Sequence, residues 1–380
     1  MMISFQLTEE QEQMQKCARD FAAAEIIPIA AEYDEKEEIP WQVIEKAYEA
    51  GLMNLAIPEE LGGQGIDPLT AAIITEEIAY GCLGVNGTFG ANELAVQPIL
   101  IAGTEEQKKK FLPDFCAKPQ LAAFGLTEPE AGSDVANVQT RAVRDGDYYV
   151  LNGNKCFITN GDSAALYTIF ATIDKSLGHK GLCAFIVPGD TPGIRGGKKE
   201  QKMGDRCSEV AEVILEDVRV PVANLLGKEG DGFKIAMETL DVTRPGIGAA
   251  AVGVARRAFE EAKKYSLQRI QFGKPIAANQ AIQFMFAEMA TKIDAARLLV
   301  WRSAQYLAIG LRASKEGSMA KFYAADIAME ATVDALQIMG GSGYMRDYPV
   351  EKLMRDAKIL QIYEGTNQVQ RMVIAREILK

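Results

Sequence analysis

Apolar residues in the last third of the chain recur with the period of a helix. They advance by three or four positions and comprise Ile282, Met285, Met289, Ile293, Ala296 and Val300. This spacing places them on one stripe of an amphipathic helix that packs against a core. Helical patterns also fill the first third, where Thr8 and Gln11 have the spacing of a capping box. Helices are therefore predicted on both sides of the middle of the chain.

The middle of the chain changes to the pattern of β-strands. Short β-rich runs occupy residues 148–151, 184–187 and 212–215, and turns are predicted at Asp145-Gly146 and Asn152-Gly153. These runs predict a small antiparallel sheet. We find no internal repeat and no low-complexity linker. The predicted units are residues 1–120 (helical), 121–230 (β) and 231–380 (helical), packed as one α+β body.

Composition narrows the class of protein. The chain has 380 residues, 48% of them hydrophobic, without a long apolar run or a signal-peptide pattern, so we expect a cytoplasmic protein without membrane insertion. A net charge of −11 argues against nucleic acid as a partner. One histidine, His179, excludes a His-dependent triad or a multi-histidine metal site, and no metal is predicted. Six scattered cysteines predict reduced thiols in the core.

Two segments have candidate chemistry. Glu364 is the one carboxylate in the otherwise uncharged stretch 361–368, so it is a candidate base, although a solvated helix end is the commoner explanation of such a residue. Residues 127–134 combine a proline-fixed turn with small residues and hydroxyls, which lets backbone N–H groups approach a ligand closely. Taken alone, this segment is equally well explained as a structural turn.

Five motifs taken together are more specific than either segment. They occur in the order Thr127 to Asp134, Phe157 to Gly161, Arg269 to Gly273, Gln337 to Gly341 and Tyr363 to Thr366. In these motifs, and over essentially its whole length, the chain resembles the acyl-CoA dehydrogenases. The resemblance implies an N-terminal helical unit, a middle antiparallel β unit and a C-terminal four-helix bundle.

The resemblance also implies a reaction. Family members oxidise an acyl-CoA thioester to the 2-enoyl-CoA: a glutamate removes the α-proton while FAD takes the β-hydride at N5. Carried over, Glu364 is the base, and its backbone N–H and an FAD hydroxyl bind the thioester carbonyl. Removing so weakly acidic a proton requires a positioned base and a stabilised enolate-like oxygen, and desolvation would raise the base's pKa toward what the step requires. A homotetramer and electron transfer to an electron-transferring flavoprotein are further implications.

The same resemblance assigns the cofactor contacts. Residues expected at the FAD are Phe124, Leu126, Thr127, Ser133, Phe157, Thr159, Arg269, Phe272, Gln280, Gln337, Gly340, Gly341, Thr366 and Gln368. Of these, Arg269, Phe272 and Gln280 correspond to residues that reach the FAD of a neighbouring subunit. A guanidinium suits pyrophosphate, because it offers a planar fork of donors. Phe157 departs from the tryptophan that is frequent at its position, so the aromatic wall has a different shape.

Substrate contacts carry over in the same way. Residues expected near the thioester ligand are Ser133, Asp241, Thr243, Arg244, Gly365, Gly90 and Ala91. Thr243 occupies the position where the isovaleryl branch has its glutamate, so Thr243 with Glu364 indicates the commoner short- and medium-chain branch.

Small residues at Gly87, Gly90 and Ala91 leave room for a branched or cyclic acyl group, or they serve close helix packing. No lysine or arginine lies between Leu83 and Leu94, which argues against a dicarboxylic tail. We therefore expect a monocarboxylic substrate, straight-chain or alicyclic such as cyclohexanecarboxyl-CoA. The alternatives are an oxidase that passes electrons to oxygen and a non-catalytic acyl-CoA-binding protein of the same fold.

Overall fold

A computed structural model describes residues 5–380, and it begins with a layer of helices. These are α1 (Glu9–Phe21), α2 (Ala30–Lys36), α3 (Trp41–Glu49), α4 (Pro68–Gly81), α5 (Leu83–Ala102) and α6 (Glu105–Cys116). The predicted capping box is confirmed: Thr8 Oγ1 accepts from Gln11 N at 3.2 Å, while Gln11 Oε1 accepts from Thr8 N at 3.1 Å. Helices α4 and α5 are buried along most of their length, so this layer forms part of the interior.

The middle of the chain forms a sheet whose strand order is β6-β7-β3-β2-β4-β5-β8, with β1 paired to β4. The strands are β1 (Leu121–Gly125), β2 (Arg141–Asp145), β3 (Tyr148–Thr159), β4 (Ala164–Thr172), β5 (Leu182–Pro188), β6 (Ile194–Lys199), β7 (Val210–Pro221) and β8 (Leu225–Leu226). Most pairs are antiparallel as predicted, whereas β1 and β2 each pair with β4 in parallel. Helix α5 is joined to this sheet, because Asn160 Nδ2 donates to the carbonyls of Thr88 and Ala122, each at 3.1 Å.

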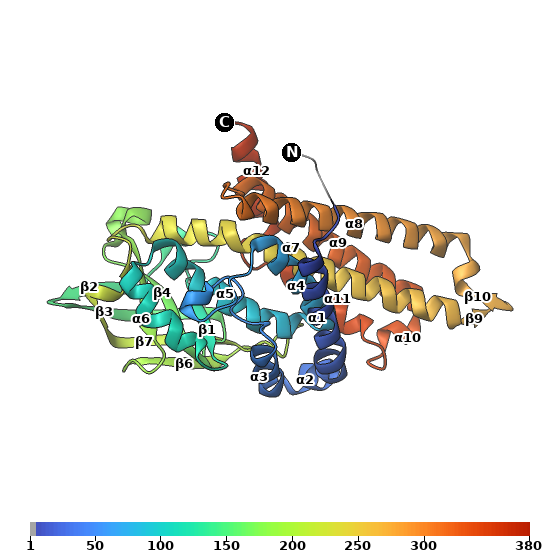
Figure 1. Ribbon diagram of the computed structural model, residues 1–380, viewed down its shortest axis with the longest axis horizontal. Helices are drawn as coiled ribbons and strands as arrows, with labels where there is room; N and C mark the ends of the chain where they lie inside the picture. The colour runs from blue at the N-terminus through green and yellow to red at the C-terminus, as the bar shows by residue number, and fades with distance from the viewer. Residues whose placement is uncertain (1–4) are drawn as a thin grey trace.

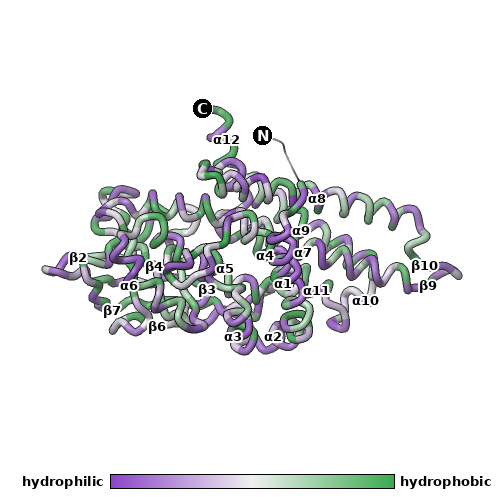
Figure 2. The backbone as a smooth tube through the Cα atoms, in the orientation of Figure 1, coloured by the Kyte–Doolittle hydropathy of each residue, from purple (hydrophilic) through white to green (hydrophobic). Residues whose placement is uncertain are grey.

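Long helices make up the rest of the molecule. They are α7 (Gly232–Gln268), α8 (Gln280–Ala308), α9 (Ser314–Met339), α10 (Gly341–Tyr344), α11 (Val350–Leu360) and α12 (Asn367–Ile378), with the hairpin β9 (Ile270–Gln271) and β10 (Lys274–Pro275). Figure 1 shows the sheet at one end of the molecule and this hairpin at the other, with the long helices between them. Hydrophilic and hydrophobic stretches alternate along α8 and α9 in Figure 2, as expected of amphipathic helices.

The predicted apolar stripe is confirmed on α8. Met289, Ile293, Ala296 and Val300 are buried in one core cluster, together with small residues of α7 and α9. Alanine is frequent in that cluster, which lets the helix axes approach closely. The helix, sheet, helix order follows the prediction, while the domain limits at 120 and 230 stay a prediction.

Two local predictions are wrong. Asn152-Gly153 is not a turn, because β3 continues through it and its register against β7 shifts there as a β-bulge. Asn152 Oδ1 accepts from Asp217 N at 2.9 Å, and a Cβ at Gly153 would lie 2.4 Å from Thr140 Oγ1, so glycine is required by close packing. The second error concerns Cys17, whose thiol is exposed; the other five cysteines are buried as expected.

Within residues 5–380, no helix is both long enough and apolar enough to cross a membrane.

Candidate active site

Glu364 lies in the loop between α11 and α12, which we call the base loop (residues 361–366). Its backbone has a φ of 50°, in the left-handed region, and the next residue, Gly365, has a φ of 90°. The φ of 90° at position 365 favours glycine, and a Cβ there would also lie 2.6 Å from Gln370 Nε2. A non-glycine residue held in such a conformation requires support from its surroundings.

The Glu364 side chain points to α7. Thr243 Oγ1 donates to Glu364 Oε2 at 2.7 Å, although the two residues are 121 positions apart in the chain. The structure thus brings together the candidate base and the position of the alternative base. Because a threonine hydroxyl is far too weak an acid and base for this chemistry, the carboxylate is the better candidate proton acceptor of the two groups.

Burial raises the pKa of Glu364 above its ordinary value of 4.5. The Thr243 hydrogen bond and the positive charges of Arg244 and Lys321 act against this increase. A carboxylate with a raised pKa is a stronger base than one in water, while the two nearby cations favour its ionised form. The environment of Glu364 is therefore suited to accepting a proton from a weak carbon acid.

Asp241 and Arg244, two of the residues expected near the thioester ligand, pair with each other. Arg244 NH1 donates to Asp241 Oδ1 at 2.7 Å, and the arginine is 3% exposed. Ser314 Oγ also donates to Asp241 and accepts from Arg312 Nε at 2.7 Å. Asp241 thus holds Arg244 beside the base, and Arg244 adds positive charge to the site.

Two residues that the sequence analysis missed hold the base loop. Lys321 Nζ, on α9, donates to Gly365 O at 2.9 Å and to Asn367 Oδ1 at 3.1 Å. Gln370 Nε2, on α12, donates to Glu364 O at 3.1 Å and to Gly365 O at 2.9 Å. Both side chains are fully buried. The sequence shows only that Lys321 shares a helical spacing with the small residues Gly317, Ala324 and Ala328, whose burial the structure reveals, whereas Gln370 had no such signal.

The first motif forms a turn after β1, here called the Thr127 turn (residues 126–134). Buried Glu128 anchors it by accepting from Lys155 Nζ at 2.6 Å and from Thr140 N at 3.0 Å. Cys156 N donates to Thr127 O at 3.0 Å, which joins the turn to β3. Leu126 is buried, Phe124, Thr127 and Thr159 are half-buried, and Ser133 is exposed.

The surface around the Thr127 turn fits the flavin that the resemblance implies. Phe157 is 66% exposed and has a φ of 58°, which turns an aromatic ring outward instead of into the core. A Cβ at Gly132 would meet nothing within 4 Å, so a ligand has access to the backbone there. An exposed ring, an accessible backbone and hydroxyls at Thr127 and Ser133 can together accept a flat, polar-edged ring system.

The other expected FAD residues lie elsewhere. Arg269 and Phe272 are exposed at the β9–β10 hairpin, where Phe272 is 99% exposed, and the exposed Gln280 follows as the first residue of α8. Figure 1 shows this hairpin far from β1. Gln337, Gly340 and Gly341 are also exposed, and Tyr265 Oη donates to Ser342 Oγ at 3.0 Å, which joins this segment to the same end of α7. One chain therefore presents the expected FAD residues in two separate groups, one at the Thr127 turn and one near the β9–β10 hairpin. Thr366 caps α12 by accepting from Val369 N at 3.3 Å, and Gln368 is exposed.

The small residues of α5 differ among themselves. A Cβ at Gly87 would lie 3.2 Å from Ser208 Oγ and 3.3 Å from Asp205 Oδ1, so Gly87 serves close packing. Ala91 is buried, whereas a Cβ at Gly90 would meet nothing within 4 Å. The sequence left open whether these small residues serve close helix packing or leave room for an acyl group. Packing explains Gly87, and of the three positions only Gly90 has free space.

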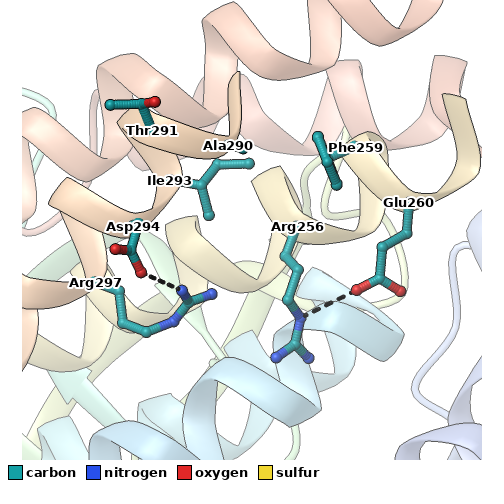
Figure 3. Close-up of a pocket in the computed structure, with 8 residues that line it drawn as sticks. All are labelled: Arg256, Phe259, Glu260, Ala290, Thr291, Ile293, Asp294 and Arg297. Carbon is teal, nitrogen blue, oxygen red and sulfur yellow. Dashed lines mark hydrogen bonds and ion pairs between the residues drawn. The ribbon is translucent and has the colours of Figure 1, made fainter. Parts of the chain in front are cut away.

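A pocket of about 540 Å³ lies away from this site, between α7 and α8. Figure 3 shows its lining, in which Arg256 pairs with Glu260 at 3.9 Å and Arg297 pairs with Asp294 at 3.3 Å. Both arginines also pair with Glu76 of α4, Arg256 at 2.8 Å and Arg297 at 3.0 Å, so the charged groups of the pocket already have partners. Among the described residues, no group of three or more His, Cys, Asp or Glu side chains could hold a metal ion.

Comparisons with known proteins agree with this geometry. Three family models match the chain: the acyl-CoA dehydrogenase N-terminal domain (residues 8–119), middle domain (residues 123–218) and C-terminal domain (residues 230–379). The short-chain specific acyl-CoA dehydrogenase of Clostridium acetobutylicum is 45% identical over 380 residues, with both chains covered completely.

Two solved structures are also similar over the full length of both chains. Butyryl-CoA dehydrogenase from Megasphaera elsdenii has a TM-score of 0.97 and 44% identity. A chain of the structure described as the electron transferring flavoprotein of Acidaminococcus fermentans has a TM-score of 0.97 and 49% identity. The chain belongs to the acyl-CoA dehydrogenase family and is an FAD-dependent oxidoreductase that acts on acyl-CoA.

Proposed function

We propose that the protein converts a short-chain acyl-CoA to the 2-enoyl-CoA, with Glu364 as the base that takes the α-proton. One observation carries this proposal: Glu364 is held in a left-handed backbone conformation, with a raised pKa, against a single hydroxyl donor. A carboxylate used for structure would be expected to accept several hydrogen bonds, whereas Glu364 keeps accepting capacity for a substrate proton. Bound FAD supplies the acceptor for the β-hydride.

The protein's own residues would orient the substrate as follows. Thr243 and Glu364 lie together at the reacting carbons, and the backbone N–H of Glu364 is assigned to the thioester carbonyl. The Thr127 turn and Phe157 would hold the flavin ring, and closure of the site by the acyl chain would remove water from Glu364 and raise its pKa further. Asp241 and Arg244 are assigned to the CoA portion.

Replacement of the base tests this function. Glu364→Gln keeps the size and loses the proton acceptor, so we expect kcat with butyryl-CoA to fall by about 10²- to 10⁴-fold. The measurement is bleaching of the oxidised flavin without oxygen. Near-full turnover in a variant that binds FAD normally would show that another group is the base.

The acyl group is the finer part of the proposal. The name of the Clostridium relative and the Megasphaera structure both support a straight C4 chain. An alicyclic acyl group remains the second candidate, supported by the space at Gly90. A panel of straight C4 to C8 thioesters and cyclohexanecarboxyl-CoA, assayed by the same bleaching, separates them, and failure of the whole panel would contradict the substrate class.

We propose further that the working form is a homotetramer. The hairpin group (Arg269, Phe272 and Gln280) is too exposed and too far from the Thr127 turn to serve the same FAD within one chain, which supports its contribution to a neighbouring copy. Light scattering of the purified holoenzyme measures the mass, and a monomer with full FAD content and activity would contradict this arrangement.

The proposed electron acceptor is an electron-transferring flavoprotein, a partner supported by the Acidaminococcus structure. Steady-state turnover with that protein as acceptor tests it, and peroxide release in air without an acceptor would instead favour the oxidase alternative. All six cysteines are free thiols, which supports the proposed cytoplasmic location.

A further inference from the structure

We propose that Lys321 is a positioning residue for the base: its buried ammonium fixes the Gly365 carbonyl and supplies a positive charge beside the Glu364 carboxylate. This inference rests on the proposed function, because it presupposes that Glu364 accepts the substrate proton. It assigns a role in the reaction to a residue that lies 43 positions before the base in the sequence and comes from a different helix.

The contacts of Lys321 are unusual for a buried lysine. The side chain is fully buried on α9, and its two acceptors are both neutral, Gly365 O at 2.9 Å and Asn367 Oδ1 at 3.1 Å. Among the described residues, no carboxylate lies within ion-pair distance of its Nζ. An ammonium without a directly bonded counter-charge is costly to bury, so a purely structural tie would be better made by a neutral group.

Such a neutral tie is already present. Gln370 Nε2 donates to the same Gly365 carbonyl at 2.9 Å and to the Glu364 carbonyl at 3.1 Å. Lys321 therefore duplicates one hydrogen bond of the base loop, and it alone adds the bond to Asn367 Oδ1 and a positive charge. Lys321 and Glu364 form no ion pair, and the nearby ammonium opposes the rise of the Glu364 pKa through its charge.

The charged and titratable groups around the pair come from three helices and the base loop. They are Asp241 and Arg244 on α7, Lys321 and Asp326 on α9, Tyr363 and Glu364 in the base loop, and Arg371 and Arg376 on α12. Burial lowers the pKa of Lys321 to about 8, while Glu364 acts to raise it. Lys321 is therefore still protonated near neutral pH, where the charge is needed.

The contacts of Asn367 continue the support. Asn367 Nδ2 donates to Asp326 Oδ1 at 2.8 Å and to Phe322 O at 3.1 Å, and Gln361 Nε2 donates to the same Asp326 oxygen at 2.6 Å. Both ends of the base loop are thus bound to α9 near Lys321. A displaced ammonium would shift the whole loop, and misplacement of a reacting group by about 1 Å costs on the order of 100-fold in rate.

The test compares the FAD-loaded variants Lys321→Met and Gln370→Met, using butyryl-CoA. Lys321→Met loses both the hydrogen bonds to the base loop and the charge, so we expect a lower kcat. We also expect the acid limb of the kcat/KM profile to move to higher pH by about one unit, which lowers kcat/KM about tenfold at pH values below the limb. Gln370→Met loses a neutral tie only, so kcat is expected to fall while the acid limb stays at its wild-type pH.

Two further variants keep the proposal testable if Lys321→Met does not fold. Lys321→Gln removes the charge but keeps a donor, and we expect the same movement of the limb. Lys321→Arg keeps the charge, and we expect the limb at its wild-type position. An acid limb at its wild-type pH in Lys321→Gln, or an equal shift of the limb in Gln370→Met, would overturn the electrostatic role.

Failure of this inference can be told apart from failure of the proposed function. Loss of turnover in Glu364→Gln together with wild-type behaviour of the Lys321 variants would refute this inference alone. An active Glu364→Gln would refute the proposed function.

Discussion

Glu128 and Glu364 are two carboxylates near fully buried lysines, and their environments differ. Glu128 accepts from Lys155 Nζ at 2.6 Å, from Thr140 N at 3.0 Å and also from Gln139 N and Thr140 Oγ1. Burial alone would raise its pKa, but these partners outweigh burial and the pKa is lowered. Glu364 has the single side-chain donor Thr243 and a raised pKa. The number of direct donors thus separates a carboxylate that holds a turn from one that can accept a proton.

The largest expected effect on folding separates the two lysines. Lys155→Met leaves the Glu128 carboxylate buried without its counter-charge, which is expected to lower the free energy of unfolding by about 3–5 kcal/mol. Lys321→Met leaves no directly paired carboxylate, so its cost should be clearly smaller. Urea unfolding of both variants measures the difference. Equal losses would show that the direct ion pair is not what distinguishes the two regions.

The double variant Glu128→Gln/Lys155→Met sharpens the same test. Because both members of the pair are then neutral, it should be more stable than the sum of the two single effects predicts. Additive losses would mean that each residue contributes through packing alone.

A second prediction concerns the single donor of Glu364. Thr243→Val removes the hydrogen bond to the carboxylate at nearly constant volume, and a hydrogen bond to a charged group contributes about 1.5 kcal/mol, or roughly one pKa unit. The acid limb of kcat/KM is therefore expected to move to higher pH, with about a tenfold loss below it and little change above it. A pH profile with butyryl-CoA measures this shift.

Thr239→Val is the matched control for that experiment. Thr239 lies one turn earlier on α7, is fully buried, and its hydroxyl has no hydrogen-bond partner among the described residues. The same change of side chain there should leave the limb in place. A shift of similar size in both variants would point to a general disturbance of α7 instead of the Thr243 bond.

Sequence reasoning identified Glu364 itself, but it did not identify the residues that hold it. Glu364 was identified because a carboxylate is conspicuous in an uncharged stretch, and the family motifs then supplied its role. The two residues that hold it were missed: Gln370 is one polar residue among several on α12, and Lys321 becomes notable only when its neighbours at three and four positions prove to be buried. Contacts between distant segments depend on tertiary packing, and local patterns do not record them.

One local fold prediction, the turn at Asn152-Gly153, failed for a related reason. The helical period of residues 282–300 was sufficient to predict α8, since burial of one stripe determines that helix. Asn152-Gly153 has the composition of a turn, yet pairing of β3 with β7 extends through it, and the register between those distant strands decides the outcome.

The smallest expected effect is a difference in the pH dependence of stability. Glu364 has a folded pKa above its ordinary value of 4.5, so the folded state binds its proton more tightly than the unfolded state does. Its contribution to stability is complete below pH 4.5 and is lost as the pH rises through the folded pKa. Glu128 has a lowered folded pKa, so its contribution is present above pH 4.5 and is lost as the pH falls through that lower value.

Unfolding free energies measured from pH 3 to pH 8 would therefore differ in sign between the two variants. Relative to Glu364→Gln, the wild type should lose stability as the pH rises above about 4.5, whereas relative to Glu128→Gln it should lose stability as the pH falls below about 4.5. If the difference in unfolding free energy from wild type changed with pH in the same direction for both variants, both carboxylates would have pKa values shifted in one direction. That result would contradict the assignment of Glu128 as the paired carboxylate and Glu364 as the available base.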